Sequence, residues 1–114
     1  MNIHYLEIVS NDVEREISML VAAQGVSFGE PVAELGGARI ADAPGGGMIA
    51  VRAPMHGGEK PVARPYFLTE SLDASVEALR ELGAEIAIAS MPIPGQGTIA
   101  IYMVDGIEYG LWQN

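Results

Sequence analysis

The chain has 114 residues, of which 49% are hydrophobic and 18% are charged, and its formal net charge at pH 7 is −9. This length and composition predict one folded domain with a hydrophobic core and exclude an intrinsically disordered chain. The negative charge argues against binding to nucleic acid or to an anionic membrane surface, because both would repel the protein.

The first half of the chain opens with a predicted strand and helix. Residues 3–9 alternate as a strand does, with Tyr5 and Glu7 on one face. Asn11 is the predicted N-cap of an amphipathic helix that ends at Gly25. Three further strands are expected in this half, at residues 28–35, 38–43 and 48–52.

A glycine-rich segment separates the two halves. We expect module one to span residues 1–56, a linker to span 57–61 and module two to span 62–114. Together the modules form a single domain.

The second half repeats the same order of elements. A strand over residues 64–69 leads into a helix that Ser71 caps and Gly83 ends, and a strand over 84–89 follows. Two prolines and two glycines predict a loop over 91–97 that could cover a cleft as a lid. The last two strands, 98–104 and 107–113, flank a two-residue hairpin turn at Asp105-Gly106.

The repeat is visible in the residues themselves. Residues 8–20 can be laid over residues 67–79, and the apolar positions then coincide at Ile8/Phe67, Val9/Leu68, Val13/Leu72, Ile17/Val76 and Leu20/Leu79. Two such units predict a pseudo-symmetric domain, with a crevice for a ligand between its halves.

Four segments, in this order and spacing, resemble the vicinal oxygen chelate superfamily, which includes glyoxalase I, bleomycin-resistance proteins and extradiol dioxygenases. They are Glu7-Ile8-Val9-Ser10-Asn11-Asp12-Val13-Glu14-Arg15, Leu82-Gly83-Ala84, Ile93-Pro94-Gly95-Gln96-Gly97 and the ending Asp105-Gly106-Ile107-Glu108-Tyr109-Gly110-Leu111-Trp112-Gln113. The nearest resemblance is to small, uncharacterised, glyoxalase-related bacterial members. It implies an α+β fold in which two βαβββ modules form a curved mixed sheet around a cleft, often in a homodimer.

The resemblance also implies where a metal ion would bind. The superfamily's four ligand positions fall here on Tyr5, on Ala50 or Val51, on Arg64 and on Gly110. None of these is a histidine or a carboxylate, and a catalytic divalent site needs at least three nitrogen or oxygen ligands. Shifting the alignment by one residue brings in His4 but still assembles no site. We therefore expect no metal ion and no cofactor.

Glu7 and Arg64 are the charged candidates for a binding site. Glu7, the best candidate for a catalytic residue, could act as a general base in a half-apolar pocket, or it could be a structural partner of Arg52 or Arg64, which we favour. Arg64 could clamp an anionic ligand, or it could pair with Glu7 or with an acid of a partner chain. Arg52, at the end of a strand, is expected at the surface, as is Glu108 beside the hairpin turn.

Aromatic side chains complete the predicted site. Tyr5, Tyr66, Tyr102 and Trp112 can line a cleft, or they can serve the core or a dimer interface. His4 is expected to be a partly buried histidine with a structural role.

These observations favour a metal-independent small-molecule binding protein of the glyoxalase/bleomycin-resistance type. The residues predicted to bind the small molecule are Tyr5, Glu7, Arg64, Tyr66, Tyr102 and Trp112. The alternative is a lyase or isomerase of the same superfamily, with a carboxylate general base and a small anionic substrate. The resemblance implies a homodimer. We expect a cytoplasmic protein, because the N-terminus shows no signal peptide and no apolar run approaches the roughly 20 residues of a spanning helix.

Overall fold

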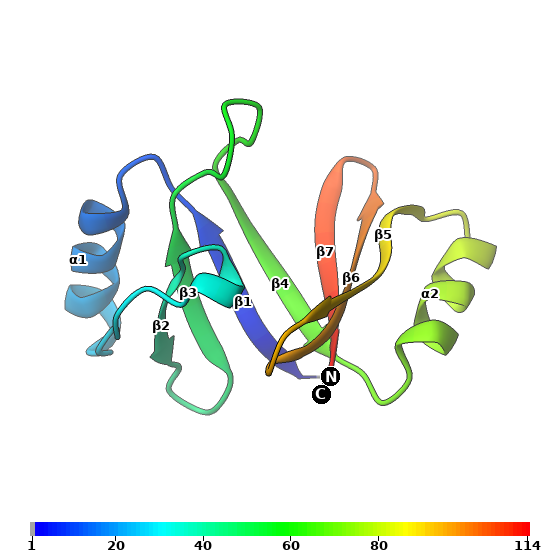
Figure 1. Cartoon of the computed structure of the whole chain (residues 1–114), viewed down its shortest axis with the longest axis horizontal. Helices are drawn as coiled ribbons and strands as arrows, with labels where there is room; N and C mark the ends of the chain where they lie inside the picture. The colour runs from blue at the N-terminus through cyan, green and yellow to red at the C-terminus, as the bar shows by residue number, and fades with distance from the viewer. Residues whose placement is uncertain (1) are drawn as a thin grey trace. The chain divides into compact units, whose positions relative to one another are not determined.

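The computed structural model of the chain describes residues 2–114 and contains, over this range, seven strands, two α-helices and one 3₁₀ helix (Figure 1). The chain divides into two compact units, each with strands and one α-helix. The first unit is Tyr5–Ala63, and the second unit joins the N-terminal residues through His4 to Arg64–Asn114. The α+β fold predicted from the sequence is confirmed.

The first unit is built on the strand β3 (Met48–Arg52). This strand runs parallel to β1 (Ile3–Val9) and antiparallel to β2 (Arg39–Asp42). Helix α1 (Val13–Gln24) packs against β3, with Ile17 as its buried residue. Side chains of β1 alternate between more buried and less buried positions, as the sequence predicted.

The ends of α1 follow the expected chemistry with a shift of one residue at the start. The N-cap is Asp12 rather than Asn11, and its carboxylate accepts a hydrogen bond from the backbone N–H of Arg15 at 3.1 Å. Gly25 ends the helix in the left-handed conformation, with φ of 67°. A glycine takes this conformation without the steric cost that a Cβ would add.

The strand predicted over residues 28–35 is wrong. Val32 makes one isolated bridge with Ala38, and Ala33–Leu35 form the 3₁₀ helix η1. Gly36 and Gly37 adopt φ of 69° and 80°, which turns the chain and prevents an extended strand. The described part of the first unit therefore has three strands, where the sequence predicted four.

The second unit has the strand, helix and three strands that the sequence predicted. Strand β4 (Val62–Leu68) runs parallel to β7 (Ile107–Gln113), which pairs antiparallel with β6 (Gly97–Val104), and β6 pairs antiparallel with β5 (Glu85–Ile93). Helix α2 (Leu72–Glu81) covers one face of this sheet.

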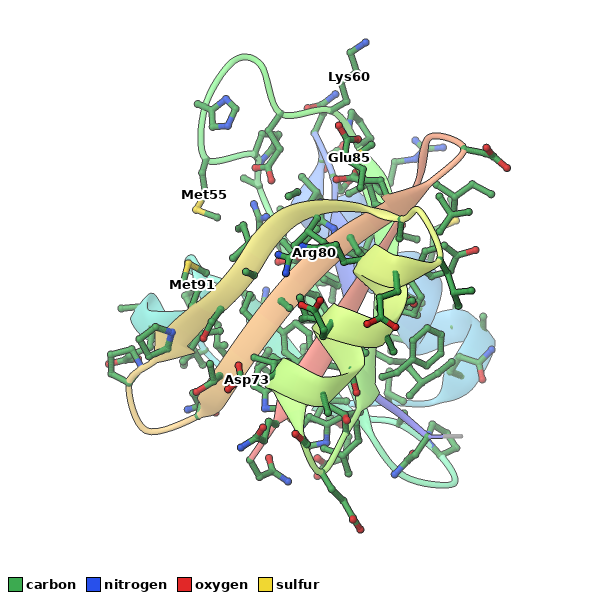
Figure 2. The ribbon with its side chains drawn as sticks, turned by 90° about the vertical axis from the view of Figure 1, so that its right-hand side faces the viewer. Met55, Lys60, Asp73, Arg80, Glu85 and Met91 are labelled. Carbon is green, nitrogen blue, oxygen red and sulfur yellow. The ribbon has the colours of Figure 1, made fainter. Side chains whose placement is uncertain are left out.

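The core of the second unit lies between α2 and its sheet. Leu72 and Val76 of the helix are buried against Ala100 and Leu111 of the strands. Partly buried hydrophobic residues surround them: Phe67, Leu79, Ile86 and Tyr102. Figure 2 views the helix from outside, with Asp73 in its first turn and Arg80 in its last, where their charges complement the helix dipole.

The loop predicted over residues 91–97 is wrong in its first part, because β5 continues to Ile93. Met91 lies opposite Ile99 and Pro92 lies opposite Thr98, after two register shifts. β5 is the outer strand of the sheet in this unit, and an edge strand accommodates a proline that has no N–H to donate. This part of the segment belongs to the sheet and is not a free lid.

The hairpin between β6 and β7 is confirmed. Asp105 and Gly106 have φ of 50° and 81°, and a two-residue turn of type I′ requires positive φ at both positions. No helix within residues 2–114 is long and apolar enough to cross a membrane.

Candidate functional site

The first unit contains a buried charged cluster around Arg52, which is only 3% exposed. Arg52 Nε donates a hydrogen bond to Glu7 Oε2 at 2.8 Å. Its Nη1 and Nη2 donate to the two carboxylate oxygens of Glu59, each at 2.7 Å. Glu59 also accepts a hydrogen bond from the backbone N–H of Met55 at 2.8 Å. One guanidinium therefore joins β1, β3 and the segment that follows β3.

This cluster corrects the expectation that Arg52 lies at the surface. A planar guanidinium can serve two carboxylates at once, because its donors point along separate edges. The hydrogen bonds that Arg52 donates to Glu59 raise the pKa of Arg52 above its ordinary value. The same bonds lower the pKa of the Glu59 carboxyl from 4.5 to about 2. Glu59 was absent from the predicted site, and only its spacing of seven residues from Arg52 could have suggested the pair.

Glu7 occupies the structural role that the sequence analysis favoured. It is 7% exposed, and it contributes a carboxylate oxygen to the buried ion pair with Arg52. Tyr5 lies on the same face of β1 and is 2% exposed. Protonating Glu7 during a catalytic cycle would weaken its bond to a buried cation, which is costly.

In the second unit, the sheet face opposite α2 carries Arg64, Tyr66 and Trp112. All three are buried, with exposed fractions of 6%, 3% and 1%. The ring of Tyr66 meets that of Trp112 edge to face, with centroids 5.8 Å apart. The indole N–H of Trp112 donates to the carbonyl oxygen of Gln96 at 3.1 Å. These contacts fix two aromatic rings on the sheet face that also carries Arg64.

Arg64 has an ion-pair partner that the sequence analysis placed at the surface. Its Nη2 donates to Glu108 Oε1 at 3.2 Å, and the Glu108 side chain is 32% exposed. The register explains the pair, because Tyr66 lies opposite Gly110 in the parallel strands and Arg64 is two residues earlier, as Glu108 is.

His4 contacts Trp112, whereas Tyr102 lies on the other face of the sheet. The ring centroid of His4 is 5.2 Å from that of Trp112, and burial lowers the pKa of the His4 imidazole. Tyr102 stacks on Tyr109 with ring centroids 5.3 Å apart, and it packs against the core beneath α2. Tyr102 therefore lies on the opposite face of the sheet from Arg64 and is not brought together with it.

The two units place different chemistry at equivalent positions of the repeat. In the first unit, Glu7 lies opposite Ala50, and Arg52 is two residues further along β3. In the second, Tyr66 lies opposite Gly110, and Trp112 is two residues further along β7. An ion pair in one unit thus corresponds to an aromatic pair in the other, and each has a small residue beside it.

These positions do not fit a metal ion of the superfamily type. A Cβ on Gly110 would overlap the ring of Tyr66, so no ligating side chain can replace this glycine without moving the tyrosine. Ala50 is fully buried and has no donor atom, and Arg64 is a cation. Within the part of the chain that the structure describes, no three histidine, cysteine, aspartate or glutamate residues gather where they could hold a metal ion.

The fold is similar to that of several solved structures. A hypothetical protein from Bacillus halodurans matches 99% of this chain and 94% of its own, with a TM-score of 0.74 and 12% identity. A variant of methylmalonyl-CoA epimerase from Streptomyces coelicolor, in complex with 2-nitronate-propionyl-CoA, matches 100% of this chain and 94% of its own, with a TM-score of 0.70 and 18% identity.

A variant of 4-hydroxymandelate synthase, also from Streptomyces coelicolor, reaches a TM-score of 0.78 at 16% identity, over 98% of this chain and 38% of its own. No family model matches the sequence, and no curated protein matches it either. The epimerase and the synthase have the fold of the vicinal oxygen chelate superfamily, and the chain therefore shares that fold.

The cluster around Arg52 predicts how stability depends on pH. The pKa of Glu59 is about 2 in the fold and 4.5 ordinarily, so its stabilising effect is complete above about pH 5 and declines as the pH falls toward 2. Urea denaturation between about pH 6 and pH 3 should show a smaller loss of stability in Glu59→Gln than in the wild type. Glu14→Gln, which removes an exposed partner of Arg39, should retain the wild-type pH dependence. Equal pH dependence in Glu59→Gln and the wild type would contradict the assignment.

The contact between Tyr66 and Gly110 gives a second prediction. Gly110→Ala should lower the free energy of unfolding by roughly 1–3 kcal/mol, because the added methyl group overlaps the tyrosine ring. Gly57→Ala is the matched control, because a Cβ there meets nothing within 4 Å, and it should stay near the wild-type stability. Equal unfolding curves for the two variants would show that Tyr66 does not need the glycine.

Proposed function

We propose that the chain is a small-molecule binding protein that recognises an anionic ligand without a metal ion. The observation that carries this proposal is the sheet face of the second unit that carries Arg64, Tyr66 and Trp112, where the two rings contact each other and Arg64 pairs with the partly exposed Glu108. A guanidinium binds carboxylate or phosphate groups through paired N–H donors. Neighbouring aromatic rings supply apolar contact at a low entropic cost, because their orientation is already fixed.

The residues at the superfamily's metal positions support the metal-independent part of the proposal. They offer a phenol, an aliphatic side chain, a guanidinium and a glycine, which together do not make a divalent site. Tyr5 and Glu7, on the buried face of β1, remain proposed ligand-binding residues. Tyr102 is left out, because it packs beneath α2. The homodimer that the resemblance implies also remains a proposal.

Trp112 is the only tryptophan of the chain, so its fluorescence reports directly on the proposed face. We suggest titrating the protein with methylmalonyl-CoA and with inorganic phosphate, with and without EDTA. A saturable change in emission that persists in EDTA is expected from at least one probe. Arg64→Gln should weaken that binding at least about tenfold, since a charge-assisted hydrogen bond contributes about 1.5–3 kcal/mol.

Arg80→Gln is the matched control, because it makes the same charge change on the exposed side of α2, where Arg80 pairs with Glu77. It should leave the affinity unchanged. Equal affinities in the two variants, binding that EDTA abolishes, or no response to either probe would contradict the proposal.

An isomerase is the second candidate, favoured by the structural similarity to methylmalonyl-CoA epimerases over the full length of the chain. Epimerisation next to a thioester needs a base that removes a proton, and Glu7 is the carboxylate that the sequence offers for this role. The ion pair of Glu7 with Arg52 speaks against it, because the carboxylate already serves a buried cation. The same reasoning applies to a lyase that uses Glu7 as its base.

Deuterium exchange separates the two candidates. We expect the wild-type protein, incubated with methylmalonyl-CoA in D₂O, to incorporate no deuterium at the carbon next to the thioester beyond the buffer rate, as measured by mass spectrometry. Incorporation by the wild type that Glu7→Gln abolishes and Glu14→Gln retains would establish the isomerase and refute the leading proposal.

A further inference from the structure

The segment between β3 and β4, residues 53–61, forms a loop that projects beyond the end of β3 (Figure 1). Met55 and Lys60 lie on its two limbs in Figure 2. Most of the loop is exposed, and only Pro54 and Glu59 are half-buried. The side chain of Glu59 is 15% exposed and reaches back to Arg52, which is nearly inaccessible. The loop is thus fastened to the first unit by a carboxylate held against a guanidinium.

The donors around Glu59 converge as they would on a bound ligand. Arg52 offers Nη1 and Nη2 in a bidentate arrangement, and the Met55 backbone N–H adds a third hydrogen bond. Three donors on one carboxylate, two of them charged, form a strong and directional binding site. The occupant of this site comes from the chain itself.

Arg52 is held in place by contacts that do not involve Glu59. Its Nε is committed to Glu7 on β1, and its Nη1 also donates to the carbonyl oxygen of Ala53 at 3.2 Å. Its Cδ lies 3.2 Å from where a Cβ of Gly36 would be, so the turn after η1 covers the side chain closely. The outer edge of the guanidinium therefore keeps its orientation when Glu59 leaves.

We propose that Arg52 and the Met55 N–H form a carboxylate-binding site, and that Glu59 is a tethered occupant that a free carboxylate ligand displaces when residues 57–61 of the loop move away. Gly57 and Gly58 stand next to Glu59 and provide the backbone freedom for this movement. The exchange leaves the net charge of the cluster unchanged, because the carboxylate of the ligand replaces the carboxylate of Glu59 on Arg52.

A carboxylate suits this site better than a phosphate. A planar carboxylate matches the paired Nη donors that Glu59 now uses, whereas a phosphate dianion would bring additional negative charge close to Glu7. The proposal concerns the first unit alone and does not depend on the ligand that binds beside Arg64.

The loop that carries Glu59 determines the concentration of free carboxylate that is needed to displace it. A group held by a short flexible segment competes at an effective concentration in the millimolar range. The apparent affinity for a free carboxylate is reduced by the fraction of molecules in which the site is open, and removing Glu59 abolishes that reduction. Acetate should therefore bind Glu59→Ala at least about tenfold more tightly than it binds the wild type.

The first experiment measures the melting temperature in sodium acetate and in sodium chloride of equal ionic strength at pH 7. Glu59→Ala should melt below the wild type, and acetate should restore its melting temperature in a saturable way that chloride does not. Glu14→Ala removes a carboxylate from an exposed pair with Arg39, and it should gain nothing from acetate. Equal effects of acetate and chloride on Glu59→Ala would overturn the proposal.

The second experiment uses the wild-type chain, so it holds even where Glu59→Ala fails to fold. A glutamyl endopeptidase can cleave after Glu59 only when its carboxylate leaves Arg52 and enters the protease. Acetate should accelerate the appearance of the fragment 1–59 by several-fold over chloride, as followed by mass spectrometry, while cleavage of a denatured control should not change. An unchanged rate would show that Glu59 only fastens the loop. Neither experiment involves Arg64, so failure here would not count against the ligand face of the second unit.

Discussion

The buried guanidinium of Arg52 is the interaction on which the first unit depends. Removing an arginine from water is costly, and the cost is offset only where carboxylates and carbonyl oxygens take up its donors. Here Glu7, Glu59 and the carbonyl of Ala53 do so, and the three come from different segments of the chain. The strand β1, the strand β3 and the loop after β3 are consequently held to one another by charge as well as by the backbone ladder between the strands.

In the second unit, aromatic rings occupy the positions that the ion pair occupies in the first unit. Tyr66 corresponds to Glu7 in the repeat and Trp112 corresponds to Arg52, with Gly110 and Ala50 as the small residues beside them. An aromatic pair buries large apolar area at little desolvation cost, whereas the ion pair is sensitive to the loss of either partner. The two units therefore differ in chemistry at equivalent positions of the repeat.

Features encoded by neighbouring residues could be predicted from the sequence, and features encoded by strand register could not. The alternation of residues 3–9, the cap at Ser71 and the turn at Asp105-Gly106 each rest on a few adjacent residues, and all three are confirmed. The pairing of Arg64 with Glu108 depends on how β4 and β7 are aligned, and the position of Tyr102 depends on which sheet face α2 covers. Pro92 was misread for a related reason, since a proline is excluded from a central strand and not from an edge.

The packing around Gly110 determines whether a side chain that could bind a metal ion fits at this position. The ring of Tyr66 occupies the room that a side chain at position 110 would need. Trp112, anchored by its bond to Gln96, meets the edge of that ring and limits where it can move. A coordinating side chain at position 110 would therefore displace the ring of Tyr66, which contacts Trp112. Tyr66 and Trp112 are thus coupled, and a change at either ring is expected to affect the packing of the other.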